Sequence, residues 1–183
     1  MRMKVTTTIA LSLAGACMSV PALAQSAIPA PRVPASAMTD VREHWRAMSG
    51  FVLQSAMQVP EAQYGYRPIK GVRSFGEIFL HVAGAQSMFC AMALGEKPPA
   101  EDAVKATGKA AIVDALRQST TDCERAYGQG DAEAAASIDV FGASHTRLYA
   151  LMMNAMHNAE HYGNLVTYLR MTGMVPPSSQ PTP

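Results

Sequence analysis

The chain has 183 residues, of which 49% are hydrophobic and 16% are charged, and its formal net charge is +1 at pH 7. It contains no block of basic residues, so nucleic acid is not an expected partner. After the first 24 residues, no segment is long and apolar enough to be predicted as a transmembrane helix.

Residues 1–24 are predicted to be a secretory signal peptide. Arg2 and Lys4 give a positive start, an apolar run reaches about Val20, and residues 22–24 read Ala-Leu-Ala, a small-residue cleavage site. Cleavage there leaves about 159 of the 183 residues, which suits one domain. We therefore expect a periplasmic or secreted protein. Lipidation at Cys17 is the less favoured alternative, because the leucine usual three residues earlier is absent.

Export would change the charge and leave two cysteines. Without Arg2 and Lys4, thirteen basic residues face fourteen acidic ones, so the mature net charge is about −1. Cys90 and Cys123 form either one disulfide, as an oxidising compartment allows, or two buried thiols.

The first elements follow from apolar spacing and from helix-breaking residues. Residues 25–36, rich in Pro, Ala and Ser, are predicted to be a linker. A helix over residues 37–57 follows, because apolar residues such as Trp45 recur at steps of three and four until Pro60.

The second helix has clear ends. Ser74 and Glu77 form a capping box at its start, and Gly95 ends it. Apolar residues at helical spacing form one stripe along this helix, and His81 lies within that stripe.

Two further helices are predicted, over residues 107–127 and 145–171. Gly128 ends the first of them, and Gly173 ends the second. Residues 178–183 are polar and are predicted to be a disordered tail.

These elements predict an all-α protein, with a four-helix bundle over residues 37–177. The long connection over residues 95–106 permits the second and third helices to run parallel, in an up-down-down-up order. Cys90 and Cys123 lie near corresponding ends of these two helices, so the disulfide and this topology are one linked prediction.

Three histidines are the candidate metal ligands. His157 and His161 are four residues apart, so they share one helix face. His81 is the best third ligand because it lies in an apolar stripe, whereas His44 has charged neighbours and His145 lies about 18 Å from His157 along the helix. Three imidazoles suit a divalent metal, with zinc first and nickel or iron as alternatives. The alternative interpretation is that these histidines only pack in the core.

Two further patterns suggest other kinds of metal site. Residues 157–161 match H-x-x-E-H, in which Glu160 would be the general base of a metalloprotease, but no acidic residue follows to complete that site. Glu160 remains a candidate for proton transfer, and its alternative role is that of a solvated carboxylate. Met152, Met153 and Met156 raise a copper site as an option, but they are predicted to pack in the core.

The ordered combination of Trp45, the segment YGYRPIKGVRSFGEIFLHVAGAQ and the closing segment HNAEHYGNLVTYLRMTGMVPP resembles the DinB/YfiT-like superfamily over about residues 38–177. The resemblance implies an up-down-down-up bundle, often a homodimer, with a divalent metal on His81, His157 and His161. It also implies activities such as thiol-dependent S-transfer. The Arg-Gly-Gln usual in the family after the last ligand is here Tyr162-Gly163-Asn164, which removes a cation near the site.

The resulting functional hypothesis is an exported metal-dependent transferase or hydrolase that acts on a small molecule, which in a transferase is joined by a thiol. Glu160, Tyr162 and Asn164 are the nearest polar candidates for support. The rival hypothesis is a non-catalytic bundle that binds a metal or another ligand.

Overall fold

The computed structural model describes residues 36–181. The predicted signal peptide and nearly all of the predicted linker lie outside the described residues. Residue 36 is the last of that linker, and its side chain caps the first helix by accepting a hydrogen bond from the backbone of Thr39.

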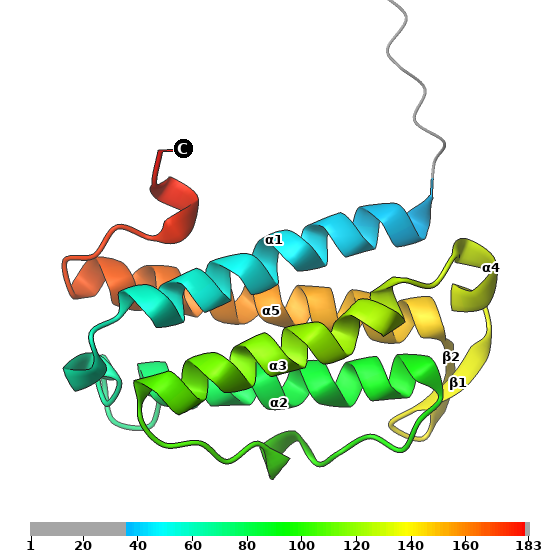
Figure 1. Ribbon diagram of the computed structural model, residues 1–183, viewed down its shortest axis with the longest axis horizontal. Helices are drawn as coiled ribbons and strands as arrows, with labels where there is room; N and C mark the ends of the chain where they lie inside the picture. The colour runs from blue at the N-terminus through cyan, green and yellow to red at the C-terminus, as the bar shows by residue number, and fades with distance from the viewer. Residues whose placement is uncertain (1–35, 182–183) are drawn as a thin grey trace, which may run out of the picture. The chain divides into compact units, whose positions relative to one another are not determined.

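Within residues 36–181, four long helices form the bundle, and their bounds are α1 (Ala37–Gln58), α2 (Phe75–Leu94), α3 (Lys109–Tyr127) and α5 (Arg147–Met171) (Figure 1). The shorter elements are η1 (Glu61–Gln63), η2 (Glu101–Ala103), α4 (Asp131–Ala134), β1 (Ser137–Val140), β2 (Ala143–Thr146) and η3 (Pro177–Ser179). The predicted all-α bundle is therefore confirmed, with one small hairpin added to it.

The ends of α2 are those predicted from the sequence. Ser74 accepts a hydrogen bond from the backbone of Glu77, and the Glu77 carboxylate accepts one from the backbone of Ser74. Gly95 ends the helix with a φ of 72°, a conformation that glycine adopts without steric cost. These ends set the position of His81 along the helix.

Contacts between side chains show the directions of the helices. Gln86 donates to Ser119 at 3.0 Å, and further along both helices Cys90 and Cys123 form a disulfide with their Cα atoms 5.3 Å apart. Both contacts advance together along the chain, so α2 and α3 run parallel. The connection between them returns along the length of the bundle (Figure 1).

α5 runs antiparallel to α2. Asn158 of α5 donates to Gln86 of α2 at 3.0 Å. Tyr168, ten residues further along α5, donates at 3.0 Å to the backbone oxygen of Arg73, which precedes Gln86 by thirteen residues. The contacts thus advance along α5 while they go back along α2. α1 runs parallel to α5, because Phe51 stacks on Tyr162 and Gln58 bonds to the backbone of Val175. This order of directions is the predicted up-down-down-up order.

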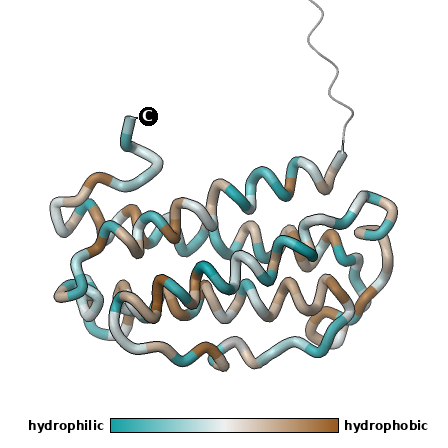
Figure 2. The backbone as a smooth tube through the Cα atoms, viewed as in Figure 1, coloured by the Kyte–Doolittle hydropathy of each residue, from teal (hydrophilic) through white to brown (hydrophobic). Residues whose placement is uncertain are grey.

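The core has an apolar part at each end and polar residues between them. One part includes Phe75, Phe79 and Leu165, and the other includes Trp45 and Tyr127, whose rings stack 4.1 Å apart. Hydrophilic residues are sparse along α2 (Figure 2). By length and composition α2 could cross a membrane, although no such segment was predicted after the signal peptide. In the structure, however, 61% of the most apolar window of this helix is buried inside the bundle. A buried core helix meets the same criterion.

The β1–β2 hairpin was not predicted. Its strands have four residues each, too few to show alternation, and its turn uses Phe141 and Gly142, which both have positive φ. His145 therefore lies in β2 and not in a helix, and α5 begins at Arg147.

The prediction of a disordered tail needs correction for its first residues. Tyr162 donates to the hydroxyl of Ser178 at 2.7 Å and accepts from its backbone at 2.8 Å. Gln180 bonds to Gln58 of α1 at 2.8 Å. The segment is polar, as the sequence shows, but its polar groups bond to the bundle.

Candidate metal centre

Three histidines from two helices meet at one point of the bundle. His81 comes from α2, and His157 and His161 come from α5, on one face because they are four residues apart. The antiparallel packing of these helices brings all three together, with one ligand atom of each within 4.8 Å of the others. His161 is buried, and the other two are half-buried.

The ring nitrogens converge on His157. Its Nε2 atom lies 3.0 Å from Nε2 of His81 and 3.1 Å from Nε2 of His161. A ring nitrogen has either one proton or one lone pair, so this atom cannot both donate to one neighbour and accept from the other. A cation between the three rings would use all three lone pairs. Zinc–nitrogen bonds of about 2.0–2.1 Å in a tetrahedron separate ligand nitrogens by roughly 3.3 Å, close to these distances.

The protonation state of His157 also suits a metal. Burial is the main cause that lowers the pKa of His157 to about 3. Positive charge on His161, His81 and Arg73 lowers this pKa further. The imidazole is therefore neutral at pH 7, and neutral imidazole is the form that binds metal.

The second nitrogens of two rings have different surroundings. Nδ1 of His161 lies 3.4 Å from the side-chain amide of Asn164, the residue predicted to support the site. Nδ1 of His157 is buried and has no hydrogen-bond partner in the described part of the chain. A ligand histidine usually donates from this second nitrogen. Because the amide nitrogen of Asn164 also donates, this amide would have to turn its oxygen toward His161 to support a bound metal.

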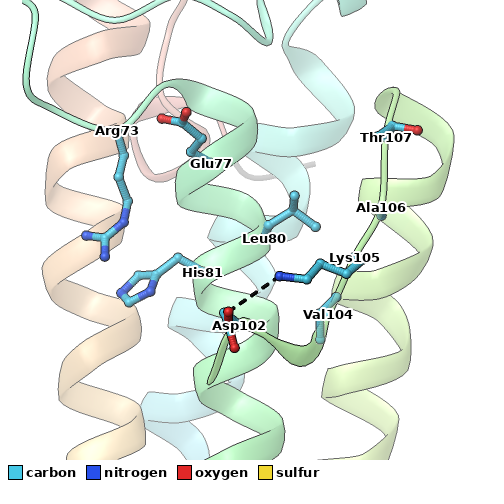
Figure 3. Close-up of a pocket in the computed structure, with 9 residues that line it drawn as sticks. All are labelled: Arg73, Glu77, Leu80, His81, Asp102, Val104, Lys105, Ala106 and Thr107. Carbon is cyan, nitrogen blue, oxygen red and sulfur yellow. Dashed lines mark hydrogen bonds and ion pairs between the residues drawn. The ribbon is translucent and has the colours of Figure 1, made fainter. Parts of the chain in front are cut away.

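A cavity of about 390 Å³ opens beside His81 (Figure 3). It is lined by residues at the start of α2 and by the connection between α2 and α3: Arg73, Glu77, Leu80, His81, Asp102, Val104, Lys105, Ala106 and Thr107. The guanidinium group of Arg73 extends along α2 toward the His81 ring (Figure 3). A second cavity of about 380 Å³ is lined by His161, Asn164 and, again, Arg73.

Of the predicted supporting residues, Glu160 and Tyr162 are not part of this cluster. Glu160 is exposed on α5, and Tyr162 bonds to Ser178 of η3. The catalytic role of Glu160 thus stays a prediction without a contact to support it. Met152 and Met156 were predicted to pack, but 39% and 56% of their surfaces are exposed, because they lie on the outer side of α5.

Arg73 and Lys105, which line the cavity at His81, were not predicted from the sequence. Both lie in irregular connections, where spacing carries no information about direction. The sequence gives one indirect indication of them. Tyr162 stands where the family usually has arginine, so any cation near the histidines has to come from another part of the chain.

Solved structures similar to this chain share its fold. A DinB-like protein from Bacillus cereus is 17% identical with a TM-score of 0.66, and the match covers 76% of this chain and 95% of that protein. A DinB-like protein from Bacillus subtilis is 20% identical with a TM-score of 0.63, and the match covers 78% of this chain and 99% of that protein. A mycothiol-dependent maleylpyruvate isomerase is 14% identical with a TM-score of 0.56, and the match covers 70% of this chain and 59% of that protein.

No curated protein matches this chain in sequence. The sequence profile of the DinB superfamily, however, matches residues 40–165. This range includes all three histidines and most of the bundle, from near the start of α1 to Leu165, six residues before the end of α5. The chain therefore belongs to the DinB superfamily, as the ordered motifs of its sequence indicate.

Proposed function

We propose that this protein is an exported, metal-dependent enzyme that acts on a small molecule. His81, His157 and His161 would hold one divalent cation, with zinc first and nickel or iron as alternatives. The observation that carries this proposal is the convergence of three ring nitrogens beside a 390 Å³ cavity. Buried histidines that only pack do not require an adjacent cavity.

A divalent cation supplies Lewis-acid chemistry, which lowers the pKa of a water or thiol and polarises a substrate oxygen or sulfur. The protein supplies the rest. Burial keeps His157 neutral, and the antiparallel α2 and α5 hold the rings together. The cavity walls orient a substrate beside His81.

We favour group transfer to or from a thiol over hydrolysis. The similarity in fold to a mycothiol-dependent isomerase supports this choice, although this chain covers 59% of that protein. The Cys90–Cys123 disulfide supports export, because disulfides persist in oxidising compartments. The thiol would then be one available outside the cytoplasm. A homodimer is part of this proposal and rests on the family resemblance.

A non-catalytic metal-binding bundle is the second candidate. The exposure of Glu160 favours it, because the carboxylate predicted to transfer protons is on the surface of α5 and is not part of the histidine group. Turnover of a thiol with an electrophile, lost together with the metal, would exclude this candidate.

The first experiment is metal analysis of the purified protein by mass spectrometry. We expect about one equivalent of metal in the wild type and its loss in His157→Ala. His44→Ala is the matched control, because His44 is an exposed histidine on α1, and it should keep the metal. Wild-type protein that stays metal-free after incubation with zinc, nickel and iron would contradict the proposal.

A further inference from the structure

Arg73 lies where two cavities approach the histidines. In the part of the chain that the structure describes, it lines both the cavity at His81 and the cavity at His161. Its backbone oxygen accepts a hydrogen bond from Tyr168 at 3.0 Å, and the next residue, Ser74, caps α2. The backbone of Arg73 is thus held in place, while its side chain reaches toward His81 (Figure 3).

The other charged side chains of the cavity at His81 have partners. Glu77 bonds to Arg67 at 2.9 Å and to the backbone of Ser74 at 2.7 Å, and the Ser74 backbone bond is the main cause that lowers the pKa of Glu77. Asp102 pairs with Lys105 at 3.5 Å.

The guanidinium group of Arg73, in contrast, forms no hydrogen bond or ion pair with the side chains that the structure describes, those of residues 36–100 and 102–181. It is therefore the cation of this cavity whose charge is not offset by a direct partner. An anionic group in the cavity could pair with this guanidinium without displacing a direct partner.

The cavity also has an apolar wall. Leu80, Val104 and Ala106 line it, and all three are partly buried against the core formed by α1, α2, α3 and α5. Apolar atoms of a ligand would bury surface against these side chains. The cavity thus combines one cation without a direct partner, an apolar wall and an edge formed by a candidate metal ligand.

We propose that Arg73 binds the carboxylate of a small ligand whose apolar part lies against Leu80, Val104 and Ala106, which places the ligand beside His81. This inference rests on the proposed function, since it names the substrate class of the same site. Arginine presents two parallel N–H groups that match a carboxylate. Phosphate is disfavoured, because a dianion would lie near the carboxylates of Glu77 and Asp102.

The test measures binding, not turnover. Calorimetry would compare benzoate with benzamide, its neutral counterpart, on metal-free protein and on zinc-loaded protein. We expect benzoate to bind about tenfold more tightly or better in both forms, as a charged hydrogen-bonded pair permits. Arg73→Gln should remove this preference, and Arg73→Lys should restore part of it. Transfer of magnetisation from benzoate to the methyl groups of Leu80 and Val104 would locate the ligand.

Arg170→Gln is the matched control, because Arg170 is an exposed arginine in the last turn of α5 that lines neither cavity, so this variant should keep the preference. Equal binding of benzoate and benzamide, an unchanged preference in Arg73→Gln, binding that requires zinc, or tighter binding of inorganic phosphate would each overturn the proposal. Zinc content measured on the same samples separates this outcome from failure of the metal site.

Discussion

Trp45 donates a hydrogen bond from its indole nitrogen to Oε1 of Gln86 at 2.6 Å, inside the bundle. The same oxygen accepts from Asn158 at 3.0 Å, and the amide nitrogen of Gln86 donates to Ser119 at 3.0 Å. Gln86 on α2 thus bonds to α1, α5 and α3. One turn further along α2, Cys90 joins α3, so polar and covalent links lie between the two apolar parts of the core.

Gln86→Ala should lower the free energy of unfolding by about 2–4 kcal/mol, because buried donors on Trp45 and Asn158 lose their acceptor. Urea unfolding followed by circular dichroism measures this change. Gln54→Ala is the control, since Gln54 is exposed on the same bundle and should change stability by about 0.5 kcal/mol or less. A loss no greater than that of the control would show that water replaces the network.

Reduction of the Cys90–Cys123 disulfide should destabilise the protein. The bond joins residues 33 positions apart, and closing a loop of this length contributes about 3–4 kcal/mol in the chain-entropy treatment. We expect a lower urea midpoint in a phosphine reductant. The double variant Cys90→Ser, Cys123→Ser should start at this lower midpoint and should not respond to the reductant. A wild-type midpoint that does not change on reduction would contradict the prediction.

The stability of the metal-free protein should depend on His157 in mildly acidic solution. Burial lowers the pKa of His157 from 6.5 to about 3, so between these values the unfolded chain binds a proton that the folded chain does not. The free energy of unfolding should therefore rise with pH across this window and fall as pH drops from 6.5 toward 3. His157→Gln should have a shallower slope there, measured by urea unfolding at several pH values. Equal slopes would contradict the assigned burial effect.

Zinc should raise the melting temperature of protein treated with a chelator, because a ligand that binds the folded state stabilises it. At zinc concentrations a hundredfold above the dissociation constant, the gain is about 2.7 kcal/mol. His81→Ala and His161→Ala should each reduce this gain, as should His157→Ala. His145→Ala should not, because His145 stacks on Tyr149 in the hairpin region, away from the cluster. A zinc-induced shift that is the same in all variants would indicate binding elsewhere.

Local features of this protein were readable from its sequence. The capping box at Ser74 and the end of α2 at Gly95 depend on interactions within a few residues, so the letters alone specify them. The pairing of His157 with His161 is also local, because a helix places residues four apart on one face. Apolar spacing predicted each long helix to within about two residues, since each buries one stripe.

The apolar stripe of the second helix and the family resemblance both indicate His81 as the third ligand. Gly108 shows the limit of such reasoning at a helix end. The third helix begins at Lys109 and not at residue 107, because Gly108 has a φ of 80°, which lies outside a right-handed helix.

Other features were decided by the tertiary structure. His81 and His157 are 76 residues apart, and their nitrogens meet because α2 and α5 pack antiparallel in one register. Arg73 faces the cavity because irregular backbone before α2 and the long connection to α3 both approach His81, which no periodicity encodes. The parallel course of α2 and α3, the hairpin and the docked segment at Ser178 likewise depend on contacts between distant residues. Sequence spacing thus determines which side chains share a helix face, whereas only packing determines which faces meet.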